Sequence, residues 1–186
     1  MNDEIIDVRI GKTFKKLEKA MCTLLKENEL GEVSISMLCK EAGINRSTFY
    51  SYFKSVPELL HHLQKKYIEE LTHQMSRYWG YRHDILLFYQ DILAYIEKNK
   101  EIFYCLYSSD TNGFIDQTIA SAITQKKLPN FNYPKISQED LNYVRIFTSY
   151  GINGIIKHWL MGNCKEPSEY IANLMYTYTK RIYLLD

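Results

Sequence analysis

Residues 46–54, with the sequence RSTFYSYFK, carry side chains that can hydrogen-bond to double-stranded DNA. Arg46 can donate two hydrogen bonds to a guanine edge or pair with a phosphate, and the hydroxyls and the lysine can contact bases or phosphates. The candidate DNA-binding residues, including one upstream serine, are Ser34, Arg46, Ser47, Thr48, Tyr50, Ser51 and Lys54. Phe49 and Phe53 are expected to face a core. The alternative for the same pattern is an ordinary helical hairpin with a polar outer face.

Two short helices joined by a tight turn are predicted to position these side chains. Ser34 is a good N-cap for a helix that begins near Ile35. Gly43 follows where a chain that leaves a helix often needs a positive φ, so this helix should stop there. Asn45 is a strong N-cap for a second helix over residues 46–53. The pattern is typical of a helix-turn-helix.

A longer helix is predicted upstream, from Arg9 to about Asn28, because apolar residues recur there at helical offsets. These residues are Phe14, Leu17, Met21, Leu24 and Leu25. Residues 1–8 have no apolar period and are expected to form a mobile lead. The apolar stripe would pack on the two short helices, which gives a minimal three-helix core.

Several residues in and around this motif match a known signature. They are Ser34, Leu38, Ala42-Gly43-Ile44, Thr48-Phe49-Tyr50, Tyr52-Phe53-Lys54 and Glu58-Leu59-Leu60. Over about the first third of the chain, the sequence resembles the N-terminal region of the TetR (tetracycline repressor) family. The resemblance implies that Tyr50 and Lys54 grip phosphates, whereas Arg46 and the neighbouring serines lie where bases are read. At Val56 the sequence departs from the family, whose members commonly carry a lysine there, so one phosphate contact is expected to be missing.

The basic charge of the chain is concentrated in its N-terminal part. Residues 9–66 hold 11 Lys/Arg against 6 Asp/Glu, whereas residues 67–186 hold 12 against 13. A basic surface attracts nucleic acid, although basic faces are often merely solvated. The asymmetry therefore supports DNA binding only in combination with the motif.

Other classes of protein find little support in the sequence. The four cysteines are far apart and have no CxxC or paired Cys/His spacing, so neither a zinc site nor a disulfide framework is expected. The adjacent His61 and His62 point about 100° apart on a helix and cannot chelate one metal together. We expect no metal, no cofactor and no enzymatic activity, because no catalytic constellation stands out. With no 18-residue apolar run and no signal peptide, the chain is expected to be cytoplasmic, without membrane contact.

The chain is expected to be all-α, with about nine helices in two domains. A three-helix helix-turn-helix DNA-binding domain, the head, occupies residues 1–56, and a larger helical ligand-binding and dimerisation domain, the body, occupies residues 57–186. Ser55 and Glu58 form a capping-box pattern that starts a fourth helix, predicted to run to Trp79. No Gly/Ser-rich linker separates the domains, so this helix would carry movement between them. Further helices are predicted over residues 84–98, 101–107, 114–127 and 137–162 and from 167 onward, with residues 128–136 as the longest irregular connection.

The body is rich in aromatic residues, which suit a pocket for an amphipathic or flat effector molecule. Plain core packing explains most of them. The candidate ligand-binding residues are Phe88, Tyr107, Phe147 and Tyr150.

Two glycines in the penultimate helix indicate a close helix contact. Gly151 and Gly154 each cost the helix about 1 kcal/mol relative to alanine, and close approach of another helix is a plausible compensation. The candidate dimer-interface residues are Gly151, Gly154, Ile155, Trp159, Leu174 and Tyr178. The last two helices would then form a four-helix bundle with a second subunit. The alternative is approach to another helix of the same chain.

The combined expectation is a DNA-binding transcriptional regulator, taken as a repressor with activation left open. It would bind a palindromic double-stranded DNA operator as a homodimer and respond to a small-molecule effector. The alternative is a helical adaptor or coregulator that keeps the helix-turn-helix shape but acts through protein contacts.

Overall fold

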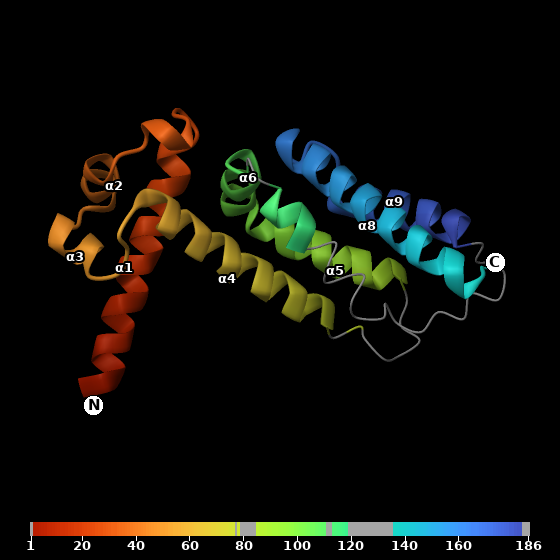
Figure 1. The fold of residues 1–186 in the computed structure, drawn as a ribbon, viewed down its shortest axis with the longest axis horizontal. Helices are drawn as coiled ribbons and strands as arrows, with labels where there is room; N and C mark the ends of the chain where they lie inside the picture. Colours follow the sequence, from red (N-terminus) through yellow and green to blue (C-terminus); the bar gives the residue numbers. More distant parts are fainter. Residues whose placement is uncertain (1, 77, 79–84, 111–112, 119–135, 184–186) are drawn as a thin grey trace.

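One long helix, α4 (Val56–Ser76), joins two groups of helices in this computed structural model (Figure 1). The structure describes residues 2–76, 78, 85–110, 113–118 and 136–183, and no strand occurs among them. The predicted all-α class is confirmed. None of the helices in these ranges is both long and apolar enough to cross a lipid bilayer.

The N-terminal group contains three α-helices and a short 3-10 helix. They are α1 (Asn2–Leu24), η1 (Leu30–Glu32), α2 (Ile35–Ala42) and α3 (Arg46–Tyr50). The helix predicted from Arg9 begins earlier, because α1 already starts at Asn2. A helix that has formed downstream extends toward its N-terminus without needing an apolar stripe.

The two short helices begin where their capping residues predict. The Ser34 hydroxyl accepts a hydrogen bond from a backbone N–H three residues on, at 3.2 Å, so α2 starts directly after it. Gly43 has a φ of 61°, a left-handed conformation that suits glycine, and it ends α2. Asn45 has the extended backbone of an N-cap, but its side chain makes no capping hydrogen bond. The second helix ends at Tyr50, before the predicted Phe53, and the chain continues as a turn in which the Tyr52 and Phe53 N–H groups both donate to the Phe49 carbonyl.

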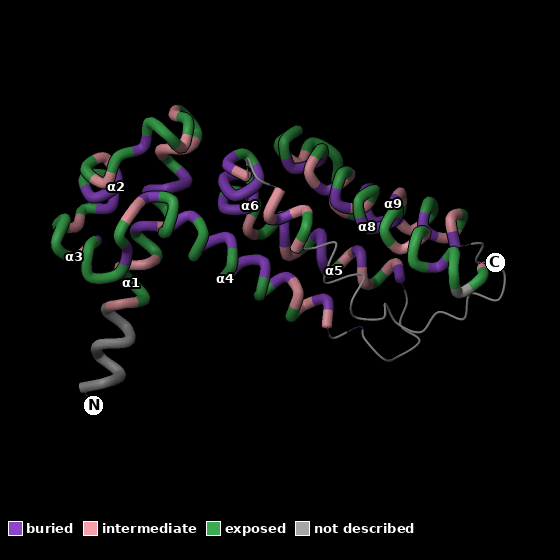
Figure 2. Tube along the Cα trace, viewed as in Figure 1, coloured by how far each residue is buried: buried purple, intermediate pink, exposed green. Residues whose placement is uncertain are grey.

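Ser55 and Glu58 cap α4. The Glu58 N–H donates to the Ser55 hydroxyl at 3.3 Å, and the Glu58 carboxylate accepts from the Lys54 N–H at 2.6 Å. The predicted capping pair is therefore present, with its return bond one residue before the cap. The predicted extension of α4 to Trp79 lies outside the described residues. Buried residues recur along the whole of α4 (Figure 2), and they are Val56, Leu59, Leu60, Leu63, Gln64, Tyr67, Ile68, Leu71 and Met75.

The body is built around α5. Its helices are α5 (Ile85–Lys98), α6 (Lys100–Ser108), α8 (Gln138–Met161) and α9 (Ser168–Ile182). Residues 114–118 are also helical, and the rest of the predicted helix to 127, with the connection over 128–135, lies outside the described residues. α5 packs against α9, α4 and α6. The Ser137 hydroxyl accepts from the Asp140 N–H at 3.0 Å and caps α8 where predicted.

One hydrophobic core runs from the head into the body. Leu17, Leu38 and Phe49 are fully buried in the head, and Leu93 and Phe103 are fully buried in the body, within a single contiguous cluster. α1 also packs against α6. The head is thus held to the body by packed side chains as well as by α4.

Candidate nucleic-acid interface

The outer face of α3 presents polar side chains, while its inner face enters the core. Arg46, Ser47 and Ser51 are exposed, and Tyr50 has 58% of its surface exposed. Lys54 is exposed just after the helix, and Thr48 is half-buried. The Phe49 and Phe53 rings are buried, as the pattern predicts. Ser34 is exposed at the start of α2, where its hydroxyl caps that helix.

A hydrogen bond between the two short helices orients Arg46. Its Nη2 atom donates to the hydroxyl of Ser36 on α2 at 2.7 Å. Both residues are exposed, so the guanidinium keeps its other donors available to a ligand. Ser36 is missing from the sequence-based candidates, because a contact between residues ten apart across a turn has no periodic signal.

Aromatic side chains pack against the inner side of the turn that follows α3. Phe14 of α1 contacts the rings of Tyr52, Phe53 and His62 with centroids 5.2 to 5.4 Å apart. His62 also contacts Phe53 at 5.4 Å. Burial lowers the pKa of His62, and the nearby Lys66 and Lys65 lower it further. The turn after α3 is therefore fixed against both α1 and α4.

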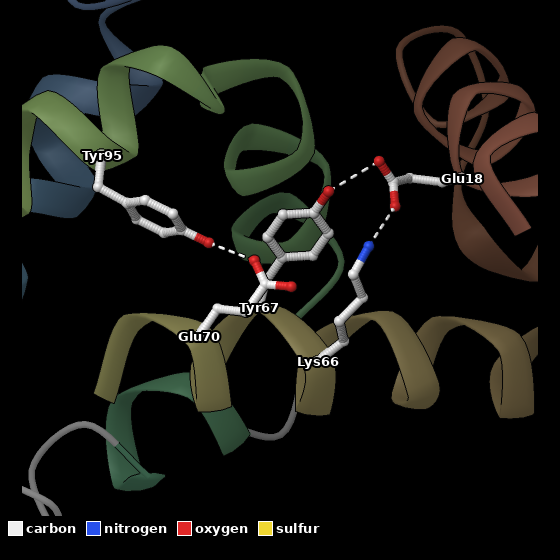
Figure 3. A network of polar contacts seen from close by, with 5 residues as sticks. All are labelled: Glu18, Lys66, Tyr67, Glu70 and Tyr95. Carbon is white, nitrogen blue, oxygen red and sulfur yellow. Dashed lines mark hydrogen bonds and ion pairs between the residues drawn. The ribbon is translucent and has the colours of Figure 1, made fainter. Parts of the chain in front are cut away.

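Five polar residues connect three helices where the head meets the body, and we call them the junction network (Figure 3). They are Glu18 of α1, Lys66, Tyr67 and Glu70 of α4, and Tyr95 of α5. The Tyr67 hydroxyl donates to one Glu18 oxygen at 2.7 Å, and Lys66 Nζ donates to the other at 3.1 Å. The Tyr95 hydroxyl donates to Glu70 at 2.6 Å.

Both phenols of the junction network stay protonated and act as donors. Burial raises the pKa of Tyr67 well above its ordinary value, and the hydrogen bond to Glu18 adds to the effect. Burial and then Glu70 raise the pKa of Tyr95 in the same direction. The two rings also contact Phe103 of α6, at 5.9 and 5.8 Å between centroids. Polar and aromatic contacts thus tie α1, α4, α5 and α6 together.

The four candidate ligand-binding residues differ in their burial and surroundings. Tyr107 is buried, and its hydroxyl donates to Asn153 Oδ1 of α8 at 2.7 Å. Phe88 is half-buried on α5. Phe147 and Tyr150 lie on the outer surface, with 68% and 51% of their areas exposed. The inward positions of that part of α8 are occupied by buried Thr148 and Ser149 instead.

The candidate dimer residues lie mainly on the outer face of α8 and α9. Gly151 and Gly154 are exposed, and a Cβ added to either would meet no atom within 4 Å, so no helix in the described part of this chain approaches them closely. Ile155 and Leu174 are half-buried, and Tyr178 is 47% exposed. A groove of about 400 Å³ runs along this face beside both glycines.

Trp159 is the exception among these candidates. It is 1% exposed, and its indole N–H donates to the Glu166 carbonyl at 2.8 Å. The ring therefore packs in the body core, although it borders the groove. Exposed aromatic residues that the candidate set omits also lie on these two helices, and they are Tyr143 and Tyr170.

The possible metal ligands and two of the cysteines can be assessed within the described residues. No cluster of three or more His, Cys, Asp or Glu side chains able to hold a metal occurs in the ranges that the structure describes. Burial raises the pKa of Cys39, and a hydrogen bond with Cys22 followed by burial raises that of Cys105. Thiolates, the reactive form, are therefore disfavoured at both positions.

Comparison with known proteins matches both parts of the chain. Residues 19–63 match the family described as "Bacterial regulatory proteins, tetR family", and residues 83–181 match "Transcriptional regulator C-terminal region". The HTH-type dhaKLM operon transcriptional activator DhaS of Lactococcus lactis subsp. lactis (strain IL1403) is 31% identical over 100 residues. That alignment covers 54% of this chain and 51% of DhaS, so it spans about half the length of the relative.

Solved structures share the fold over nearly the whole chain. The dihydroxyacetone kinase operon activator DhaS has a TM-score of 0.63 and 22% identity, and covers 91% of this chain and 97% of its own. A TetR transcriptional regulator from Streptococcus agalactiae 2603V has a TM-score of 0.65 and 22% identity, covering 95% and 98%. The fatty acid degradation regulator FadR from Bacillus halodurans has a TM-score of 0.68 and 13% identity, covering 89% and 93%.

Proposed function

The chain belongs to the TetR family of DNA-binding transcriptional regulators, and we propose that it binds a palindromic operator as a homodimer under the control of a small molecule. The main support for this proposal is that the two faces of α3 differ in polarity. Its outer face exposes Arg46, Ser47, Tyr50 and Ser51, whereas Phe49 fixes its inner face in the core. A helix held in this way can enter a major groove with its side chains free for bases.

Base and phosphate contacts divide along this face. Arg46 suits a guanine edge, since Ser36 already holds its guanidinium in one orientation. Tyr50 and Lys54 suit phosphates on either side. Val56, which stands where the family commonly has a lysine, is 6% exposed and packs in the core. This position therefore offers no cation to a phosphate. The affinity for DNA should depend less steeply on salt concentration than in family members that carry the lysine.

The outer face of α8 and α9 is the proposed contact between subunits. Gly151 and Gly154 would let a partner helix approach closely, and the neighbouring exposed aromatic residues would be buried by it. We assign Phe147 and Tyr150 to this contact instead of to a ligand pocket, because both are more than half exposed. A two-fold dimer would set its two heads about 34 to 36 Å apart, which matches successive major grooves on one side of the duplex.

The effector is proposed to act through the junction network. A ligand that favours the non-binding arrangement by about 1 to 3 kcal/mol would weaken operator affinity by roughly 5- to 150-fold, and the operator would weaken ligand binding equally. Phe88 and Tyr107 remain the candidates for effector contact within the body.

The protein could repress or activate transcription from the promoter that it binds. The family resemblance favours a repressor, and this is our assignment, whereas the relative DhaS is an activator by name. Deletion of the gene distinguishes the two, because transcription from the operator-bearing promoter rises if the protein represses and falls if it activates.

Selection of genomic fragments on the purified protein tests DNA binding and yields the operator. A variant with alanine at Arg46, Tyr50 and Lys54 should fold and select nothing. The matched control removes an exposed lysine and tyrosine from the body, Lys98 and Tyr104, and should select the same fragments as the native chain. A folded triple variant that retains operator affinity would refute DNA binding through the outer face of α3. A native dimer that ignores all genomic DNA would favour the adaptor alternative.

Sedimentation tests the subunit contact. Gly154→Arg should give monomers at low micromolar concentration while leaving the fold intact, because the added side chain meets open space within the chain. Gly11→Arg, at another helical glycine with open space around it, should stay dimeric. A dimeric Gly154→Arg protein would place the contact elsewhere.

A further inference from the structure

The N-terminal half of α8 carries an arginine among its inward-facing residues. Leu141 and Thr148 are buried, and Arg145 lies four residues after the first and three before the second, so the three positions share one face of the helix. Arg145 itself is half-buried. The exposed aromatic residues Phe147 and Tyr150 lie on the other side of α8. Arg145 therefore turns toward the inside of the body and away from the proposed subunit contact.

Three helices meet around Arg145. α9 packs against both α5 and α8. Tyr183, directly after α9, is 1% exposed, and the charge of Arg145 acts on its phenol. Tyr89 of α5 is also buried, and its hydroxyl shares a hydrogen bond of 2.7 Å with Thr179 of α9. Figure 1 places the start of α5, the start of α8 and the end of α9 at the end of the body farther from the head. This region is thus separate from the DNA-binding face.

The positive charge of Arg145 lacks a neutralising partner. Its Nε atom is buried and, among the described residues, has no hydrogen-bond partner. No carboxylate in the part of the chain that the structure describes forms an ion pair with the guanidinium. The neighbouring phenols stay neutral, because burial raises the pKa of Tyr89 and Tyr183, although a hydrogen bond with Thr148 and the charge of Arg145 oppose the rise at Tyr183. Removing a cation from water is costly unless an anion accompanies it, so an anion from outside the chain would complete this site.

A carboxylate is the anion that suits this environment best. A guanidinium presents its N–H groups as a planar fork, which matches the two oxygens of a carboxylate. Arg145 is the one charged group of the described residues that affects the Tyr183 phenol, so the site supplies a single positive charge. That charge balances one carboxylate, whereas a phosphate monoester carries about 1.5 to 2 negative charges at pH 7. The side chain is half-buried and not enclosed, so a small molecule can approach it from solvent.

We propose that Arg145 binds the carboxylate group of a small, singly charged molecule in the body. The inference rests on the proposed small-molecule control only in giving the effector an acidic group. Benzoate is the probe, because benzamide offers nearly the same flat shape without the charge. Calorimetric titration of the free protein at low ionic strength measures the affinity for each compound, so the site is tested without the operator.

The Arg145→Gln variant tests the pairing directly. Loss of a charge-assisted hydrogen-bonded pair should weaken benzoate binding about tenfold or more. Arg181→Gln removes an exposed arginine from α9 and should bind benzoate as the native chain does. In ¹⁵N-labelled native protein, the Nε–H resonance of Arg145 should shift with benzoate and not with benzamide. That resonance is assigned by its absence from Arg145→Gln, and the burial of Nε protects its proton from exchange with water.

Native protein should bind benzoate more tightly than benzamide or phenyl phosphate. Equal affinity for benzoate in Arg145→Gln and native protein would overturn the assignment to Arg145. Tighter binding of phenyl phosphate would overturn the carboxylate class. No saturable binding of benzoate, with an unshifted Nε–H resonance, would overturn the site itself and leave operator binding unaffected. Operator affinity that stays constant while benzoate occupies Arg145 would instead refute control through this site, and carboxylate binding would stand.

Discussion

Removal of the Tyr67 hydroxyl should loosen the head from the body while leaving the hydrophobic core packed. Tyr67 is 6% exposed, and its hydroxyl donates to Glu18 at 2.7 Å across the junction between α4 and α1. Tyr67→Phe deletes one oxygen and creates almost no cavity, because the ring keeps its edge-on contact with Phe103. The change therefore isolates one hydrogen bond of the junction network.

The expected loss follows from the surroundings of Glu18. A hydrogen bond to a charged acceptor contributes about 1.5 to 3 kcal/mol. The Glu18 side chain is 21% exposed and keeps Lys66, so water and the ammonium recover part of that contribution. We expect Tyr67→Phe to lower the free energy of unfolding by about 1 to 2 kcal/mol. Glu18→Ala should lower it by about 2 to 3 kcal/mol, because it also removes the partly exposed ion pair.

A double-mutant cycle measured by urea unfolding, at one fixed protein concentration, tests this reasoning. In the Glu18→Ala background, Tyr67→Phe should be neutral or stabilising, since the hydroxyl has already lost its acceptor. Tyr104→Phe, at an exposed tyrosine on α6, is the matched control and should have little effect. Additive losses from the two substitutions would show that the bond between α1 and α4 contributes nothing, and the junction network would lose its proposed role.

Three further predictions concern the head. Ser36→Ala should weaken operator binding by about 2- to 12-fold, because the Arg46 guanidinium must then be ordered on binding. It should also relax the preference for the base beside Arg46. Fluorescence anisotropy with operator variants measures both effects. Gly43→Ala should lower the free energy of unfolding by about 1 to 2 kcal/mol through backbone strain at φ 61°, while Gly31→Ala should stay near neutral in the same urea assay. The pKa of His62 is lower in the folded state than in the unfolded state, so the neutral imidazole stabilises the fold above the unfolded-state pKa, and this contribution is lost as pH falls. Between pH 7 and pH 5.5, the urea midpoint should therefore drop more in the native protein than in His62→Gln.

The sequence predicts best those features that depend on near neighbours. The caps at Ser34 and Ser137 and the left-handed Gly43 follow from local backbone chemistry, and the structure confirms all three. The inward placement of Phe49 and Phe53 follows from the period of a short amphipathic helix. The outer face of α3 could therefore be predicted before the tertiary arrangement was known.

Contacts between distant segments leave no such local trace. Glu18 and Tyr67 are 49 residues apart, and nothing in either helix pattern marks them as partners. The positions of Phe147 and Tyr150 on α8 could not be predicted from the sequence either. An aromatic side chain suits a cavity wall and a contact surface equally, so residue type does not distinguish the inner face of α8 from the outer one. That choice depends on how α8 packs against its neighbours.

The continuity of α4 also fixes the rotational phase between the two ends of the protein. Its 21 residues form one helix that runs from the head into the body, so it spans about 31 Å without a break. Each residue inserted into its middle would turn the head by about 100° and shift it by about 1.5 Å. One inserted alanine would point α3 away from the duplex, whereas seven would restore the direction to within about 20° but displace the head by about 10 Å. A graft of this head onto another body must therefore preserve the residue-by-residue register of α4, and a junction chosen by domain boundary alone would misalign the two reading faces of a dimer.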